Sequence, residues 1–187
     1  MIRPVRITPP AEMPITVEAA KIFLRVDGAD EDALIAALIA AAVDHLDGRA
    51  GVLGRCLVTQ VWQYQAADFQ RQFFLGMPGA VAATVHYFDR DGASQELPQE
   101  DITLVDTARG SCLVFADRQP TAVWYGPVTI DVTFGTAPDK VPAALVQAIR
   151  MLVAHWYANR EAVASGSATE LPLAVNALIA PYRWISI

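Results

Sequence analysis

The sequence predicts an α+β fold: a small bundle of two N-terminal and two C-terminal helices, with an antiparallel β block inserted between the pairs. Apolar residues recur with a helical period of about 3.6 in residues 16–51 and again in 141–183. Between these segments the period falls to two, and turn residues separate short apolar runs. Short strands joined by turns favour an antiparallel meander over a parallel α/β sheet.

The length and composition predict one domain with a substantial core. The chain has 187 residues, of which 53% are hydrophobic, so disorder is not expected. We expect a single domain with five parts: an extended arm (1–15), helices (16–51), the β insertion (56–135), helices (141–183) and a tail (184–187).

The N-terminal part changes character after a proline-rich arm. Thr16 is a suitable helix N-cap and Glu18 suits the positive end of the helix dipole. This short helix is expected to be closed by Asp27–Gly28. A second helix is expected to start at Asp30 and to end at Gly48 and Gly51. Its apolar stripe consists of residues 34, 35, 38, 39, 42 and 46.

The β block is read from alternating side chains and turn residues. The first strand is expected to be long, over 56–69, and the turn 89–92 is expected to join two extended pieces. The further strand candidates are 72–76, 80–89, 101–106, 111–115 and 127–135.

Helix returns at Pro142, a residue tolerated at the first helical position, and is expected to run to about Val163. Residues 164–170 read as a flexible connector. A last short helix is expected to open at Pro172 and to stop at Pro181.

The first C-terminal helix carries polar residues that resemble an active site. At 100° per residue, however, its apolar side chains share one face, with Trp156 among them, and His155 and Glu161 lie more than about 100° apart. Arg160 falls inside the apolar stripe, so we expect it to reach a carboxylate or helix-end carbonyls. We interpret Trp156 and Arg160 as structural residues.

No other segment predicts catalysis or a cofactor. His45, His86 and His155 lie in different elements and lack partners at metal-ligand spacing. The acidic turns 27–32 and 89–92 lack the remaining ligands of a calcium loop. No phosphate-binding loop or nucleophile elbow occurs, and Cys56 and Cys112 lack a CxxC spacing. We therefore predict no catalytic, cofactor-binding or metal-binding residues, and no enzyme.

The charge and hydropathy exclude two kinds of partner. A net charge of −6 speaks against a nucleic-acid surface made by this chain alone. No apolar run reaches the roughly 18–20 residues needed to span a bilayer, so no membrane is expected. The N-terminus has no apolar core and is not read as a secretory signal.

Three passages, in order, resemble the head–tail connector (adaptor) proteins of long-tailed phages, prophages and gene transfer agents. TVEAAKIFLRVDGADEDALIAALIAAAVDHLDGRAG resembles the N-terminal helices of that family. CLVTQVWQYQAADF resembles the strand that follows them. TFGTAPDKVPAALVQAIRMLVAHWYANRE resembles its C-terminal helix, and a short helix ending in YR then follows here too.

The resemblance implies a structural protein of the virion or gene-transfer-agent particle, assembled in the bacterial cytoplasm. It implies a ring of about twelve copies beneath the portal, joined to a downstream stopper protein, with packaged DNA passing through without specific binding. The apolar tail suits docking onto a partner. The expected partner-binding residues are Tyr182, Arg183, Trp184, Ile185 and Ile187.

The residues are also compatible with two other hypotheses of function. One is a small enzyme or ligand-binding protein that uses a cleft between the β block and the helices. The other is a different head-completion protein, such as a stopper or tail terminator.

Overall fold

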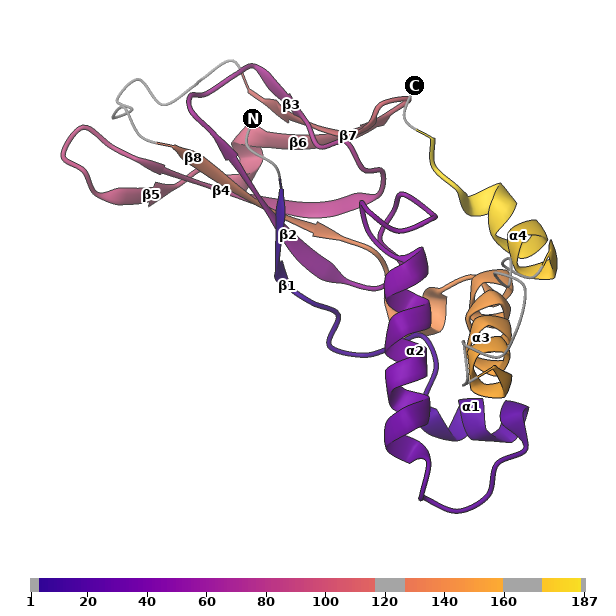
Figure 1. Ribbon diagram of the computed structural model, residues 1–187. Helices are drawn as coiled ribbons and strands as arrows, with labels where there is room; N and C mark the ends of the chain where they lie inside the picture. Colours follow the sequence, from indigo (N-terminus) through magenta and orange to yellow (C-terminus); the bar gives the residue numbers. More distant parts are fainter. Residues whose placement is uncertain (1–3, 117–126, 160–172, 186–187) are drawn as a thin grey trace. The chain divides into compact units, whose positions relative to one another are not determined.

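The computed structural model describes residues 4–116, 127–159 and 173–185, and its contacts group the chain into two compact units (Figure 1). The helical unit comprises residues 12–58 and 136–183. The β unit comprises residues 1–11, 59–135 and 184–187. Among the described residues, no helix is both long enough and apolar enough to cross a membrane.

The helical unit contains two helices from each half of the chain, as the sequence predicts. Its elements are α1 (Val17–Leu24), α2 (Asp32–Leu46), the 3₁₀ turn η2 (Pro138–Lys140), α3 (Ala143–Ala158), α4 (Leu173–Ile179) and the 3₁₀ turn η3 (Ala180–Tyr182). The predicted N-cap at Thr16 is confirmed, because its hydroxyl accepts a hydrogen bond from the backbone N–H of Ala19 (3.2 Å).

The apolar stripes of α2 and α3 form the centre of this unit. Ile35, Ile39 and Leu46 of α2 are buried, and the buried side chains of α3 join the same cluster. Trp156 lies partly buried against that cluster. The buried residues of α3 are Leu145, Ala148, Ile149, Leu152 and Val153. The helical wheel therefore predicts most of the core face of both helices. Two positions of α2 differ: Leu34, expected in the stripe, is 38% exposed, and Val43, outside it, is buried.

The loop after α2 is closed by a buried carboxylate and a glycine. Asp47 is 6% exposed and its Oδ1 accepts a hydrogen bond from the N–H of Leu57 (2.6 Å). A Cβ on Gly51 would lie 2.2 Å from the carbonyl oxygen of Asp47. Only glycine therefore fits at position 51 without a backbone shift.

The β unit contains two antiparallel sheets. Its strands are β1 (Val5–Thr8), β2 (Gln60–Ala66), β3 (Gln72–Phe74), β4 (Ala80–Phe88), β5 (Ser94–Glu96), β6 (Ile102–Thr107), β7 (Gly110–Phe115) and β8 (Val128–Phe134), with a 3₁₀ turn η1 (Gln99–Asp101) before β6. The larger sheet has the order β1-β2-β8-β4-β5 and the smaller has the order β3-β7-β6.

Strand β8 is the centre of the larger sheet and alternates in burial. Its even-numbered residues, Val128 to Phe134, are buried, whereas Asp131 on the opposite face accepts a hydrogen bond from the Gln63 side chain of β2 (2.9 Å). The smaller sheet buries Phe73 and Leu113. The α+β class with an antiparallel β block is thus confirmed.

Four boundaries or connections differ from the sequence expectation. The block is not a meander, because β8, the last strand in sequence, lies between β2 and β4. The long strand expected over 56–69 is confined to Gln60–Ala66. Residues 56–58 are buried in the helical unit instead, and Val58 bridges Thr136 in parallel.

Two helices also end earlier than expected. Helix α1 stops at Leu24, because Arg25 adopts a left-handed conformation (φ 59°) and its N–H bonds back into the last turn. Helix α3 stops at Ala158, where the side chain of Asn159 donates to the carbonyl oxygen of His155 (2.8 Å). The expected end, Val163, lies outside the described residues, as do the connector 164–170 and Pro172.

Candidate docking surfaces

The described residues do not assemble the histidines and cysteines into a reactive cluster. In the helical unit, His45 meets Trp156 edge-on at 6.2 Å and His155 neighbours Asn159, whereas His86 lies on β4 of the β unit. Within the described ranges, no group of three or more metal-ligating side chains occurs. Cys56 and Cys112 are buried in different units and are not joined by a disulfide, and burial raises the pKa of Cys112.

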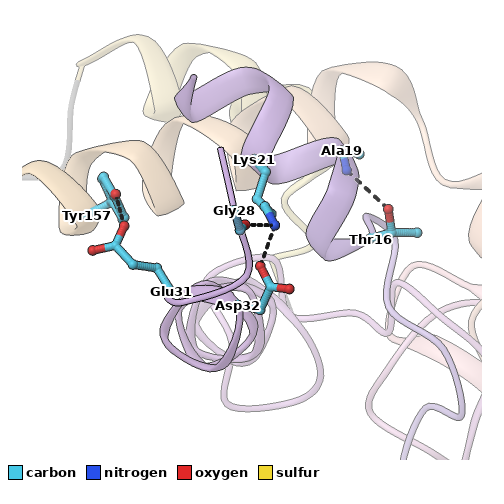
Figure 2. Close-up of polar contacts among 7 residues, drawn as sticks. All are labelled: Thr16, Ala19, Lys21, Gly28, Glu31, Asp32 and Tyr157. Atoms are coloured by element: carbon cyan, nitrogen blue, oxygen red, sulfur yellow. Dashed lines mark hydrogen bonds and ion pairs between the residues drawn. The ribbon is translucent and has the colours of Figure 1, made fainter. Parts of the chain in front are cut away.

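The acidic turn between α1 and α2 is held by contacts within the chain (Figure 2). The ammonium of Lys21 points to the carbonyl oxygen of Gly28 and to the carboxylate of Asp32 (2.6 Å). The hydroxyl of Tyr157, on α3, donates to Glu31. These contacts give the carboxylates of Glu31 and Asp32 a structural role at the start of α2.

The expected docking tail divides into an anchored part and an exposed part. Tyr182 lies partly buried against the helical core, and the guanidinium of Arg183 donates to the side chain of Asn176 on α4 (3.1 Å). Trp184 is half-buried, whereas Ile185 is 75% exposed. Ile187 lies outside the described residues, and so does Arg160. Within the described tail, the apolar surface offered to solvent is centred on Ile185.

Helix α1 presents apolar side chains that the sequence reading missed. Ile22 is 81% exposed and Phe23 is also exposed. A shallow depression is lined by Lys21, Ile22 and Glu18 of α1 and by residues 25–28, which follow the helix. The signal was present in the sequence, because the core-facing positions Val17, Ala20 and Leu24 leave Ile22 off the stripe.

Exposed apolar side chains also occur at the edges of the β unit. All four residues of β1 are exposed, including Val5 and Ile7. On β6, Val105 is 44% exposed. The period of two places Val105 on a strand, whereas β1 lies in the segment 1–15 that was expected to be an extended arm. The sequence also cannot show which strands become edges, so these surfaces could not be found from it.

Comparison with known proteins identifies the family. The model of the head completion protein family matches residues 14–184. No curated protein matches the chain. The fold is similar to a chain in the neck of an empty gene transfer agent particle computed with C6 symmetry, with a TM-score of 0.77 and 22% identity.

Two further solved structures have the same fold. A chain in the virion of a native gene transfer agent particle has a TM-score of 0.75 and 21% identity, and one in a native neck computed with C12 symmetry has 0.70 and 20%. All three alignments cover 100% of this chain and 97% of the other. The family match spans nearly the whole chain and confirms the resemblance that the sequence showed: the chain belongs to the head completion protein family.

Proposed function

We propose that the protein is the adaptor of a head–tail joint and that the whole chain acts as one connector domain. The observation that carries this proposal is the likeness in fold, over the length of this chain, to chains of gene transfer agent necks. The adaptor would lie directly beneath the portal, and a downstream stopper protein would bind its other side.

The adaptor would work as a ring of about twelve copies with packaged DNA in its lumen. A native neck with a similar fold was computed with C12 symmetry, which supports this number of copies. The net charge of −6 supports passage without specific binding, because an acidic surface repels the phosphate backbone. No enzymatic step, cofactor or membrane has a role in this function.

The C-terminal tail would bind the portal. Tyr182 and Arg183 are attached to the helical unit, so the residues after them leave from a defined point. Trp184 and the exposed Ile185 would supply the apolar contact, since a few aromatic and large apolar side chains carry most of the energy of an interface.

Imaging of the protein mixed with its portal tests the proposal. We expect rings of the chain stacked coaxially on the portal, visible by negative-stain electron microscopy. Binding to a preformed portal–adaptor complex, but not to the portal alone, would instead assign the stopper role. Binding only at the tail end would assign a tail terminator. Absence of both rings and portal binding would contradict the connector function and favour the ligand-binding alternative.

A tail variant tests the docking residues. Deletion of residues 181–187 is not a clean test of docking, because it would also remove Tyr182, which packs against the helical core. We expect Ile185→Asp to weaken portal binding by at least about tenfold, the effect of losing roughly 1.4 kcal/mol. Leu173→Asp, at an 85% exposed site on α4, is the matched control. Equal binding by both variants would remove the tail from the portal interface.

A further inference from the structure

Strand β6 is the least protected sheet edge in the described part of the chain. Both β3 and β5 are three residues long, and β1 has four residues with a register shift between Arg6 and Thr8. Strand β6 has six residues, ITLVDT, without proline, glycine, lysine or arginine. Short strands, bulges and basic residues are the usual devices that keep an edge from pairing with another chain, and β6 lacks all of them.

The hydrogen bonds of β7 show which groups of β6 face outward. Ser111 of β7 bonds away from β6, with its N–H to Met77 and its carbonyl oxygen to Leu75, and the N–H of Phe115 bonds to Arg71. Odd-numbered residues of β7 therefore face β3, and even-numbered residues face β6. Antiparallel ladders alternate in this way.

The register then assigns the free groups. Val105 pairs with Cys112 and Thr103 with Val114, so these β6 residues bond to β7. The alternate residues Leu104 and Asp106 direct their N–H and carbonyl groups away from β7. Among the described residues, no third strand pairs with this edge.

An apolar row accompanies the open edge. Phe74 of β3, Cys112 of β7 and Val105 of β6 are paired in one row across the small sheet. Both outer members of this row are exposed. A strand added beside β6 would extend the row and cover Val105. Main-chain hydrogen bonds would supply affinity and this row would supply selectivity.

We propose that the open edge of β6 receives strand β1 of a neighbouring copy in the assembled ring. This inference rests on the ring of the proposed function. A closed ring requires two different surfaces of each copy to meet, and β6 and β1 are edges of two different sheets.

Charge and apolar character favour β1 as the occupant. Strand β1 carries Arg6 and no acidic residue, whereas Asp101 directly precedes β6 and Asp106 lies near its end. The exposed Val5 of β1 offers an apolar side chain to Val105. Strand β5 is a poorer match, since its Glu96 would place like charges together.

Residue-resolved hydrogen exchange on the full-length protein, free and assembled with its portal, tests the inference. We expect the amides of Leu104 and Asp106 to slow by at least about tenfold on assembly, the factor that corresponds to roughly 1.4 kcal/mol of added protection. The amides of Thr103 and Val105 should be protected in both states, because they already bond to β7. This alternation distinguishes strand addition from general burial of the surface.

Pairwise cysteine cross-linking tests the occupant. Ring-forming mixtures of Val5→Cys and Val105→Cys proteins should give disulfide-linked dimers of mixed composition, whereas either variant mixed with Val81→Cys should not. Val81 is an exposed control residue on β4. In parallel, Val105→Lys should raise the protein concentration needed for ring assembly about tenfold and Val81→Lys should not.

The possible outcomes distinguish the pairing of β6 with β1 from the proposed adaptor function. Rings with unchanged exchange at Leu104 and Asp106 would overturn the inference and leave the adaptor function intact. Slowed exchange without the mixed Val5–Val105 dimer would overturn β1 as the occupant. Failure to form rings with or without portal would overturn both.

Discussion

The helical unit and the β unit are stabilised in different ways. In the helical unit, one cluster of buried apolar side chains joins α2, α3 and α4, and the loop after α2 is closed by Asp47. In the β unit, ladders join strands far apart in sequence, such as β2 with β8, and a buried serine ties the small sheet to the start of β4. A helix buries one face wherever its apolar residues recur with the helical period. A strand also has to pair with particular other strands, which can be distant in the sequence.

The largest expected effect lies in the loop of the helical unit. Gly51→Ala would force a Cβ to within 2.2 Å of the Asp47 carbonyl oxygen and 2.5 Å of Leu46 backbone atoms. We expect a loss of more than about 4 kcal/mol in the free energy of unfolding, measured by denaturant titration. Gly28→Ala is the control: it meets no atom within 4 Å but has a positive φ of 79°, so about 1–2 kcal/mol is expected. Equal losses would show that the loop can move aside.

A large-to-small substitution in the larger sheet tests whether β8 is the central strand of the β unit. Phe134 is fully buried on β8 and its ring lies 6.5 Å from that of Tyr64. We expect Phe134→Ala to lower the free energy of unfolding by about 3–4 kcal/mol, as large-to-small core substitutions do. Thr133→Ala, on the opposite face of the same strand, should cost under about 1 kcal/mol. A small effect of Phe134→Ala would contradict β8 as the central strand.

The hydrogen bonds of Ser111, which join the small sheet to the start of β4, should contribute less to the free energy of unfolding. Ser111 is 1% exposed, donates to Asp106 and accepts a hydrogen bond from the N–H of Ala80 (2.9 Å). Ser111→Ala leaves that N–H without its partner, so we expect a loss of about 2 kcal/mol. The exposed Ser94→Ala is the control and should be near neutral. Thermal unfolding of the two variants checks the difference.

The smallest effect concerns the turn between β4 and β5. Hydrogen bonds from the Gln95 side chain and the Ala93 N–H lower the pKa of Asp89 from 3.8. A lowered pKa means that the ionised form favours the folded turn. The stabilisation is therefore present above the ordinary pKa and is lost as the pH falls through the lowered value.

NMR titration measures this dependence. The amide of Ala93 should shift as Asp89 is protonated at low pH, and Asp89→Asn should abolish that step. A step that persists in Asp89→Asn would assign it to another carboxyl group.

Sequence periodicity predicted the helical unit better than the β unit for a physical reason. The stripe of α2 defines its buried face without reference to a partner, so Ile35, Ile39 and Leu46 could be placed from spacing alone. The alternation in β8 likewise predicts a strand. It contains no information that its neighbours are β2 and β4, because pairing depends on contacts distant in sequence.

Local chemistry explains the remaining boundary differences. The left-handed Arg25 and the side-chain contact of Asn159 end their helices before any glycine or proline does. Of the expected docking residues, Tyr182 packs within its own chain, which spacing could not show because α4 and η3 had to be placed first. The exposed edge of β6 followed only from the sheet order.

Electron microscopy of the portal mixed with this protein tests the central claim most directly. We expect a coaxial ring of about twelve copies on the portal, in line with the C12 symmetry with which a native neck containing a chain of similar fold was computed. Portal particles that carry no such ring at a saturating concentration of this protein would contradict it.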